Sequence, residues 1–493
     1  MKRPGKKILK LAFINAYDRA REYASSMPPL GMGYLISYIK RECWFIEPVF
    51  CNTPEEVLEQ KPDIVGISSA SEVFNDAIDM ARAIKEACGI PILLGGAHIS
   101  GLPKFLPGVF DIGVIGEGEQ TLAELLKAYY AADLSPAELS KIKGICYREN
   151  GAVRVTEQRP LLADLDQLPY PERDALRPEI WAVPFSEQVH MITSRGCPYT
   201  CTFCASEKIW RRYRQFSSDY VVEEIAYLRD KYDPEEIYFF DDLFIANQKR
   251  FKEICIKLKE RALHRNIYFR SYARVDLVDE EMADLFEELH FTSIDFGFES
   301  NSARVLEYFN KKNASPDLNQ RAIDLLKSRG ISLGANFIVG APVETSDDIR
   351  LTYEFIHHNI DALDRLSVGP LFPIPGTPIW DYARERGLVT EDDKMDWRRL
   401  IFYPDAFDLN YYPYLGEHVS KDEFADWMDK IERIMTQINL RGYIRHLQRR
   451  LSDKERRLHD SHKELMQLKG SRLIRFTNAM RNTLHTLGGG GKK

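Results

Sequence analysis

The stretch Thr193-Ser194-Arg195-Gly196-Cys197-Pro198-Tyr199-Thr200-Cys201-Thr202-Phe203-Cys204 brings three cysteines together with the spacing C-x3-C-x2-C. Three thiolates at this spacing can hold three irons of a [4Fe–4S] cluster, which leaves the fourth iron open to a small molecule. A structural zinc site is the alternative, but it needs four ligands, and the spacing from His190 to Cys197 matches no usual zinc pattern. The run therefore predicts a cluster at Cys197, Cys201 and Cys204. An open iron suits the binding and one-electron reduction of S-adenosylmethionine (SAM).

The composition excludes several broad classes. The chain has 493 residues and a hydrophobic content of 44%, enough for about two or three domains with large cores. A formal charge of −7 gives no case for nucleic-acid binding. The other cysteines are too few and too scattered for a disulfide framework. Met1 to Lys10 is basic, but no signal peptide is visible and no apolar run is long enough to span a bilayer. Since a solvent-reachable cluster needs a reducing environment, we expect a cytoplasmic protein.

Residues 8–140 are expected to form a doubly wound parallel sheet, because short apolar runs alternate with helical patterns. Ser68, Gly95, Gly96 and Gly116 lie at the carboxyl ends of three expected strands, where such sheets bind ligands. Glycines there let a large flat ligand approach the backbone, although tight turns need glycine as well. The expected strands are Ile8–Ala16, Phe45–Cys51, Asp63–Ser69, Pro91–Gly95 and Asp111–Gly116, and the expected helices are Gly31–Lys40, Asn75–Ala87 and Gln120–Ala131.

A connector and a second parallel sheet follow. In residues 141–187, the turn residues Asn150-Gly151 between two short β-type runs predict a β-hairpin, ahead of a proline-rich linker. Residues 188–400 again alternate strands and helices, which predicts a partial (β/α)6 barrel with its active residues at the carboxyl ends of the strands. The expected strands are His190–Thr193, Glu236–Phe240, Ile267–Tyr272, Ser293–Phe298, Ser332–Val339 and Arg365–Pro370. The expected helices are Asp219–Lys231, Gln248–His264, Glu280–Leu289, Asn319–Ser328 and Ser346–His358.

The cysteine run resembles the radical SAM superfamily, whose defining motif is C-x3-C-x2-C, and Phe203 before the third cysteine also fits that family. The glycine loops of residues 8–140 resemble the cobalamin-binding domain found ahead of many radical SAM domains. The resemblance implies a bound cobalamin lined by Ser68, Gly95, Gly96 and Gly116. The matching runs are Pro28-Pro29-Leu30-Gly31, Gly66-Ile67-Ser68, Gly95-Gly96-Ala97-His98 and Gly116-Glu117-Gly118-Glu119.

One departure from the cobalamin-binding pattern concerns the cobalt. The D-x-H-x-x-G motif, whose histidine ligates cobalt in that pattern, is absent, because Gly96 stands where the aspartate belongs. We therefore expect cobalamin without a histidine ligand from the protein. His98 is expected to be a loop residue that caps the loop or contacts a propionamide of the corrin.

Two barrel motifs resemble the part of the superfamily's SAM site that binds the amino acid moiety. Phe240-Asp241-Asp242-Leu243-Phe244 resembles the F-x-D-D-x-F element, which implies that Asp241 or Asp242 contacts the SAM amino group. Capping of the next helix is the alternative reading of these carboxylates. Arg274 could bind the SAM carboxylate through its guanidinium fork, or it could form a surface ion pair.

Two further motifs resemble the rest of the SAM site. Gly297-Phe298-Glu299-Ser300 resembles the family's G-x-E-S, which implies that Glu299 and Ser300 face SAM. Gly340 begins an element that supports the adenine through backbone contacts in that family. Glu344 is expected to cap or brace the helix that follows it.

Residues 401–493 are expected to form an aromatic segment and a basic helical tail. The aromatic segment could shape a substrate pocket or form a hydrophobic collar; its aromatic residues are Phe402, Tyr403, Phe407, Tyr411, Tyr412 and Tyr414. Lys421–Met466 is typical of one or two long helices. From Arg441 to Lys493 there are 14 Lys and Arg against 4 Asp and Glu. Such a stretch is a solvated helix, a coiled coil or an amphipathic helix on an anionic membrane surface.

The resemblance implies an enzyme that cleaves SAM to a 5′-deoxyadenosyl radical and uses cobalamin to methylate an unactivated carbon. The cofactors carry this chemistry, so no catalytic acid or base is expected from the protein. The expected partners are a lipid, glycan-type or other small-molecule substrate and an external flavodoxin- or ferredoxin-type reductant. Peripheral membrane contact through the basic tail stays open.

Three other functions are weighed against methyl transfer. A radical SAM oxidative cyclase or rearrangement enzyme would use the same radical without methylation. A methylthiotransferase needs a second cluster, and the surroundings of Cys43, Cys51 and Cys88 do not fit one. A degenerate cobalamin-binding sensor would have no use for an open iron, so the intact cysteine motif argues against it.

Overall fold

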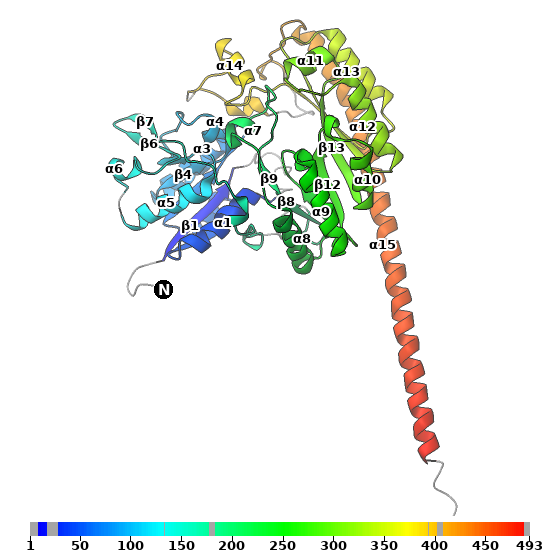
Figure 1. Cartoon of the computed structure of the whole chain (residues 1–493). Helices are drawn as coiled ribbons and strands as arrows, with labels where there is room; N and C mark the ends of the chain where they lie inside the picture. Colours follow the sequence, from blue (N-terminus) through cyan, green and yellow to red (C-terminus); the bar gives the residue numbers. More distant parts are fainter. Residues whose placement is uncertain are drawn as a thin grey trace, which may run out of the picture. The chain divides into compact units, whose positions relative to one another are not determined.

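Two parallel β-sheets with helices around them organise the computed structural model of the chain (Figure 1). The structure describes residues 8–16, 28–132, 134–176, 183–392, 394–401 and 408–487. Residues up to Met435 form one compact unit that contains both sheets, and residues from Thr436 onward form a second unit.

The first sheet has seven strands in the order β2-β1-β3-β4-β5-β6-β7. Strands β1 to β5 are parallel, whereas β6 and β7 form an antiparallel edge. The strands are β1 Leu9–Asn15, β2 Ile46–Cys51, β3 Ile64–Ser68, β4 Ile92–Gly95, β5 Ile112–Val114, β6 Ile145–Glu149 and β7 Ala152–Val155. The helices are α1 Leu30–Glu42, α2 Pro54–Gln60, α3 Phe74–Cys88, α4 Ala97–Gly101, α5 Gly118–Tyr130 and α6 Pro136–Leu139.

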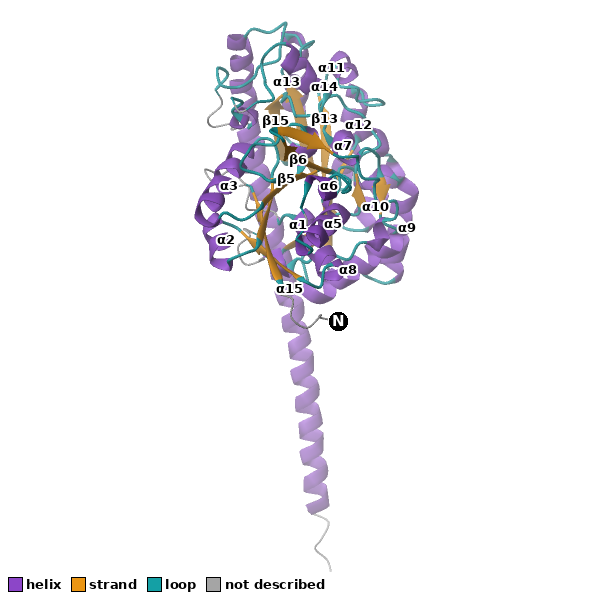
Figure 2. Cartoon of the chain, turned by 90° about the vertical axis from the view of Figure 1, so that its left-hand side faces the viewer, coloured by secondary structure: helices purple, strands orange, loops and turns teal. Residues whose placement is uncertain are grey.

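Alternate residues of β1 pack on opposite faces of this sheet. Leu11 and Phe13 join a core with α1 and α5, whereas Ala12 and Ile14 join a core with α2 and α3. Figure 2 shows helices on both sides of these strands. The two-sided burial confirms the predicted doubly wound sheet. The prediction missed the short helices α2 and α4, although Thr53 caps α2 and a proline opens it.

The predicted hairpin is present and extends the first sheet. Asn150 and Gly151 have φ angles of 52° and 81°, the left-handed conformation that a tight two-residue hairpin turn requires. Strand β6 pairs antiparallel with β5, so that Tyr147 lies opposite Ile112. The segment expected to be a connector therefore widens the sheet beyond β5.

The second sheet confirms the predicted partial barrel. Its six strands are all parallel and run in the order β15-β14-β13-β12-β11-β8. These strands are β8 Gln188–Met191, β11 Glu236–Phe239, β12 Tyr268–Ala273, β13 Phe291–Glu299, β14 Ser332–Val339 and β15 Arg365–Pro370. The helices between them are α8 Ser218–Tyr232, α9 Gln248–Glu260, α10 Glu280–Glu288, α11 Ala303–Tyr308, α12 Pro316–Ser328 and α13 Ser346–His358.

Side-chain caps fix where the barrel helices begin. The residue before α8, α9, α10, α12 and α13 accepts a hydrogen bond from a backbone N–H of the first helical turn. These caps are Ser217, Asn247, Asp279, Ser315 and Thr345, the residue types that satisfy free N–H groups at helix starts. Because capping is done by these residues, Asp241 and Asp242 are not needed as caps.

The chain returns from the barrel to the first sheet. Helix α14 (Pro378–Glu385) and the 3₁₀ helix η7 (Trp397–Leu400) contribute to the core formed by α2, α3 and the first sheet. The Trp397 ring lies 5.9 Å from the Phe74 ring, and its backbone N–H donates to Asn75 Oδ1 at 2.9 Å. Arg398 forms an ion pair with Asp76 at 3.0 Å. The last part of the expected barrel segment is therefore packed against α3.

His98 lies in this core, which corrects the expectation that it belongs to a loop. It is part of α4 and is fully buried. Its ring stacks on Phe74 at 3.6 Å and meets Trp397 edge-on at 4.5 Å. Nδ1 lies 3.1 Å from the hydroxyl of Ser71. The imidazole is enclosed by aromatic rings, so in this structure it cannot contact a propionamide.

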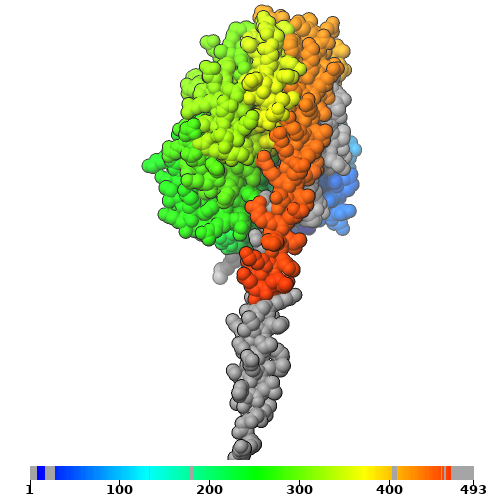
Figure 3. Space-filling model, turned by 90° about the vertical axis from the view of Figure 1, so that its right-hand side faces the viewer, coloured from blue at the N-terminus to red at the C-terminus, as the bar shows by residue number. Residues whose placement is uncertain are grey.

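Helix α15 (Lys421–Leu487) is the long helix expected in the tail. Its first turns bury Phe424, Met428 and Ile431. The Trp427 indole N–H donates to the hydroxyl of Ser346 at 2.8 Å, at the start of α13. Figure 3 shows the orange beginning of α15 against the side of the barrel. Phe402, Tyr403 and Phe407 of the aromatic segment lie outside the described residues.

Among the described residues, no helix combines the length and the apolar character needed to cross a membrane.

Burial of His98 predicts a pH dependence of stability. Burial lowers the pKa of His98 to about 3, so below its ordinary pKa of about 6.5 the unfolded chain takes up a proton that the folded chain refuses. The free energy of unfolding should therefore fall as the pH drops from about 6.5, by about 2 kcal/mol near pH 5. His98→Leu should remove this share of the pH dependence in urea unfolding followed by tryptophan fluorescence. The exposed His358→Leu is the control, and an unchanged slope in His98→Leu would contradict the prediction.

Candidate active site

The cysteine loop runs between strand β9 (Ser194–Arg195) and helix α7 (Ser206–Trp210). The segment after α11 holds its middle part. Thr202 donates its backbone N–H to the Phe309 carbonyl at 3.0 Å, and the Asn310 amide donates to the Thr200 carbonyl at 2.8 Å. The Phe203 ring packs edge-on against Phe309 at 5.1 Å. Phe203 thus anchors the loop to the barrel.

The three cysteines of this loop are free thiols. Cys197 and Cys201 are half-buried and Cys204 is exposed, and all three are free of disulfides. Among the described side chains, no three His, Cys, Asp or Glu are gathered as ligands of a single metal ion. Three thiolates can hold three irons of a [4Fe–4S] cluster, whereas a structural zinc ion needs four ligands. Iron that binds these thiols has to displace their protons.

Asp241 holds the start of the cysteine loop. Its carboxylate accepts the backbone N–H of Thr193 at 3.0 Å and the hydroxyls of Thr193 at 2.9 Å and Ser194 at 2.5 Å. Arg250 of α9 also holds Thr193, because its guanidinium donates to the Thr193 carbonyl at 2.7 Å. With 2% of its surface exposed, Asp241 is buried, and its carboxylate is already hydrogen-bonded to Thr193 and Ser194. Sequence reasoning missed Arg250 because nothing in the helix α9 pattern marks it.

Asp242 has the opposite orientation and is exposed. It accepts a hydrogen bond from the hydroxyl of Ser206, two residues beyond Cys204. Its negative charge disfavours the thiolate forms of Cys197 and Cys204 and so contributes to their raised pKa values. The two neighbouring aspartates are thus divided between holding the loop and facing the thiols.

The Gly297-Phe298-Glu299-Ser300 run ends β13 with a turn that needs its glycine. Glu299 has a φ of +65°, a conformation that is costly for a residue other than glycine. Its carboxylate folds back to an ion pair with Lys311 at 2.6 Å, and a Cβ at Gly297 would lie 2.4 Å from the carboxylate. Ser300 is fully buried and bonds to Thr352. Sequence reasoning missed Lys311. Burial raises the pKa of Cys201, and the positive charge of Lys311 opposes that rise.

Arg274 is held beside the cysteines at the end of β12. Its guanidinium stacks on Tyr199 at 3.6 Å and pairs with Asp276 at 2.9 Å. It also donates to the Lys312 carbonyl at 2.7 Å. One terminal nitrogen lies 4.0 Å from the sulfur of Cys201. The residue is thus a buried, preorganised cation next to the loop and does not form a surface ion pair.

Gly340 turns the chain at the end of β14. It has a φ of +87° and donates its N–H to Glu344. Glu344 also accepts the Ala341 N–H, and burial raises its pKa to about 8. Glu344 therefore braces this turn, while Thr345 caps the helix that follows.

A cavity of about 370 Å³ lies at the carboxyl ends of the first sheet. Ser68, Gly95, Gly96 and Gly116 all line it. A Cβ at Gly116 would meet nothing within 4 Å, and its φ of +72° suits only glycine. A Cβ at Gly96 would collide with the backbone of Ser69. These backbone surfaces leave room for a large flat ligand, so the residues fit a corrin, and the described residues that line the cavity include no histidine.

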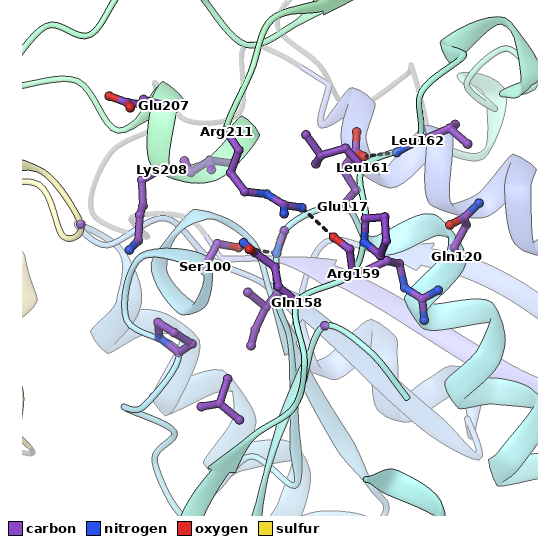
Figure 4. A pocket seen from close by; sticks show the side chains of 18 of the residues that line it. Ser100, Glu117, Gln120, Gln158, Arg159, Leu161, Leu162, Glu207, Lys208 and Arg211 are labelled. Carbon is purple, nitrogen blue, oxygen red and sulfur yellow. Dashed lines mark hydrogen bonds between the residues drawn. The ribbon is translucent and has the colours of Figure 1, made fainter. Parts of the chain in front are cut away.

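A second cavity of about 520 Å³ lies between the first sheet and the cysteine loop. Ser100 and Gly116 from the first sheet line it together with Cys201 and Cys204 from the cysteine loop. Figure 4 shows residues of α7 above Ser100, with the Arg211 guanidinium directed at the Arg159 carbonyl, 2.7 Å away. Ser100 and Gly116 line both cavities. The cavity beside the cluster loop and the cavity of the expected corrin site thus adjoin each other at Ser100 and Gly116.

A buried ionic network locks these two loops together. Arg195 forms ion pairs with Glu117 at 2.7 Å and Glu119 at 2.5 Å, and Arg214 of β10 (Arg214–Gln215) pairs with Glu117 at 2.9 Å. All four side chains are less than one-tenth exposed. Burial alone would raise the pKa of Glu117, but the two arginines hold it below its usual value. Arg195 lies two residues before Cys197, and Glu117 follows Gly116.

Comparison with known proteins supports both parts of this site. The family model of the radical SAM superfamily matches residues 191–356, and that of the B12 binding domain matches residues 18–126. An uncharacterized methyltransferase of Pyrococcus horikoshii is 31% identical over 416 residues, covering 81% of this chain and 87% of the relative. The anaerobic magnesium-protoporphyrin IX monomethyl ester cyclase of Rubrivivax gelatinosus is 29% identical over 421 residues, with 81% and 74% covered.

A solved structure shares the fold. The radical SAM methyltransferase TsrM from Kitasatospora setae superposes with a TM-score of 0.66 at 16% identity, covering 86% of this chain and 89% of TsrM. The chain therefore belongs to the radical SAM superfamily, in the group that carries a B12-binding domain ahead of the radical SAM domain. Membership implies a [4Fe–4S] cluster, SAM and cobalamin as cofactors, and the thiols and the glycine-lined cavity fit them.

The different roles of the two aspartates can be tested. Asp241→Asn places an amide N–H₂ where the carboxylate accepts several hydrogen bonds, so it should loosen the loop and lower the iron bound per chain severalfold. Asp242→Asn, one residue away, should keep its iron. Iron and sulfide analysis after anaerobic reconstitution checks both variants. Full iron content in Asp241→Asn would show that the loop does not depend on this carboxylate.

Removing one partner of the ionic network should cost more than removing the network. Arg195→Gln leaves buried carboxylates short of a partner and should lower the free energy of unfolding by about 3 kcal/mol. The quadruple change Arg195→Gln, Arg214→Gln, Glu117→Gln and Glu119→Gln should recover much of that loss, because no charge of the network then stays buried without a partner. Urea unfolding of the unchanged protein and the two variants compares them. A quadruple variant less stable than Arg195→Gln would be the opposite result.

Proposed function

We propose that the protein is a cobalamin-dependent radical SAM methyltransferase that methylates an unactivated carbon. One observation carries the proposal: Cys201 and Cys204 share a cavity with Ser100 and Gly116, which also line the glycine-edged cavity of the first sheet. Methyl transfer to a substrate radical needs the radical source and the methyl carrier to face the same space. The two adjoining cavities support this arrangement.

When bound, the cluster would supply the electron that cleaves SAM, and cobalamin would supply the methyl group. The protein's share is to hold and orient these groups. Cys197, Cys201 and Cys204 would hold three irons, and the Asp241–Thr193 contact would fix the loop that carries them. No side chain is assigned as a catalytic acid or base.

The charged groups around the thiols suit the ends of SAM. Asp242 presents a carboxylate on the side of the thiols, where it would pair with the SAM amino group. Arg274, fixed between Tyr199 and Asp276, would meet the SAM carboxylate. The Glu299–Lys311 pair would border the same space, and the turn at Gly340 would support the adenine. Ser300 would lie behind Glu299 without touching SAM, because its hydroxyl is fully buried.

The cobalamin site would bind the cofactor through backbone surfaces. Gly95, Gly96 and Gly116 let the corrin approach the strand ends, and Ser68 contributes to the same wall. A solved structure of TsrM holds cobalamin and a [4Fe–4S] cluster, which supports pairing these two groups on this fold. Because the D-x-H-x-x-G motif is absent from the sequence, the cobalt would lack a histidine ligand from the protein. A small-molecule substrate and an external one-electron reductant complete the proposal.

A radical cyclase is the second candidate, since one relative is named as an anaerobic cyclase. Both reactions would use the same thiols and the same SAM site. Product mass separates them, because a methyl group from isotope-labelled SAM appears in the product only in methyl transfer.

The test is anaerobic reconstitution with iron, sulfide and hydroxocobalamin, followed by metal analysis and by incubation with SAM and a reductant. We expect about four irons and one cobalt per chain and release of 5′-deoxyadenosine. Cys204→Ala should lose iron and SAM cleavage, whereas Cys88→Ala, an exposed cysteine of α3, should keep both. Iron without cobalt would contradict the cobalamin-dependent reaction. Absence of iron from the unchanged protein would contradict radical chemistry altogether.

A further inference from the structure

The part of α15 that follows Asn439 exposes an unusual number of large apolar side chains. They are Leu440, Tyr443, Ile444, Leu447, Leu451, Leu458, Leu465 and Met466, each between 45% and 72% exposed. They make up half of all the exposed large hydrophobic residues found in the described part of the chain. Isolated exposed leucines are ordinary on a protein surface, but a contiguous apolar stripe usually marks an interface.

Six of these residues follow a heptad repeat. Leu440, Ile444, Leu447 and Leu451 are spaced by four, three and four residues, and Leu458 and Leu465 follow at steps of seven. In a helix these spacings place all six on one narrow seam with a repeat of 3.5 residues. Ile444, Leu451, Leu458 and Leu465 occupy position a, and Leu440 and Leu447 occupy position d. Tyr443 and Met466 fall outside the seam.

The seam is narrower than the apolar face of a helix that packs on a globular core. Such a face spans three or four positions in every two turns, as in the first part of α15, where Phe424, Met428 and Ile431 are buried. Between residues 440 and 466 every position a is apolar, whereas position d is apolar at Leu447 but polar at Lys454 and Ser461, and the residues between a and d are mostly charged or polar. An apolar seam confined to positions a and d is the pattern of a two-helix coiled coil.

The charges beside the seam fit an identical helix running in the same direction. In a parallel coiled coil, the g residue of one helix meets the e residue five positions later on its partner. Arg450 at g thereby meets Glu455 at e of the second helix, and twofold symmetry makes this attraction twice. The other g–e pairs whose side chains are both described, Thr436 with Arg441 and Tyr443 with Gln448, bring no like charges together.

We infer that residues 440–466 of α15 form a parallel, in-register coiled coil with a second copy of this chain, so that the protein is a dimer. Ile444 at a, between Leu440 and Leu447 at d, is the combination that favours two strands, and leucine occupies the later a positions. Lys454 and Ser461 interrupt the d positions and limit the stability of the seam. The partner is a second copy because the seam and the flanking charges complement themselves. This inference is independent of the enzyme activity proposed above.

Sedimentation equilibrium of the full-length, cofactor-loaded protein at micromolar concentration tests the dimer. We expect the mass of two chains. The double change Leu451→Glu and Leu458→Glu places like charges face to face and should yield the mass of one chain. Met466→Glu, an equally exposed apolar residue on the same helix but off the seam, should stay dimeric. Iron content shows that each variant is folded, and a single-chain mass for the unchanged protein would overturn the inference.

A charge exchange tests the direction of the helices. Arg450→Glu should weaken the dimer about fivefold by setting like charges opposite each other in two symmetric pairs. Adding Glu455→Arg should restore the affinity, because the pair is then reversed but intact. Failure of this rescue would overturn the parallel register.

The competing use of the stripe is attachment to a membrane. Co-sedimentation with vesicles of anionic phospholipid measures it. Binding that is lost in the double glutamate variant, together with a single-chain mass without vesicles, would assign the stripe to lipid and overturn the dimer.

Discussion

The arrangement of the whole site depends on the pairing of Arg195 with Glu117 and Glu119. A charge that is removed from water must have a partner, and leaving one unpaired costs several kcal/mol. Arg195 belongs to the strand that leads into the cysteines, and its carboxylate partners directly follow Gly116 at the edge of the other sheet. Neither loop can shift alone without stranding a buried charge. This buried network therefore ties the cysteine loop to the loop that follows β5.

The carboxylates at the end of the barrel strands have two roles that their sequence motifs do not distinguish: some hold the backbone of neighbouring loops, and others face the thiols. Asp241 is used up by Thr193 and Ser194, whereas Asp242 remains on the side of the thiols. Glu299 is held in a left-handed conformation by its ion pair with Lys311, and Gly297 makes room for it. Such local strain persists only where the surroundings over-determine it. The rim of the barrel is accordingly rigid on the side that faces the cysteines.

The sequence predicted what depends on local pattern. Apolar strands such as Ile64–Ser68, the Asn150-Gly151 turn and the cysteine spacing each carry their meaning within a few residues, and the structure has both sheets in the expected places. Contacts between distant residues could not be predicted. Arg195 and Glu117 are 78 residues apart, and Lys311 carries no motif. His98 looked like a loop residue because the short helix around it has no readable periodicity, and only the packing of Trp397 reveals a core position.

The return of the chain from the barrel to the first sheet also bears on how such proteins can be rearranged. Trp397 donates to Asn75 across 322 residues of sequence and fills the same core as Phe74. The two halves are matched by separate family models, yet neither is a self-contained module. Cutting the chain between them would remove α14 and η7 from the core of the first half and expose the Trp397 ring to water. Recombining halves from different relatives should therefore succeed only when α14 and η7 come from the same relative as the N-terminal half against which they pack.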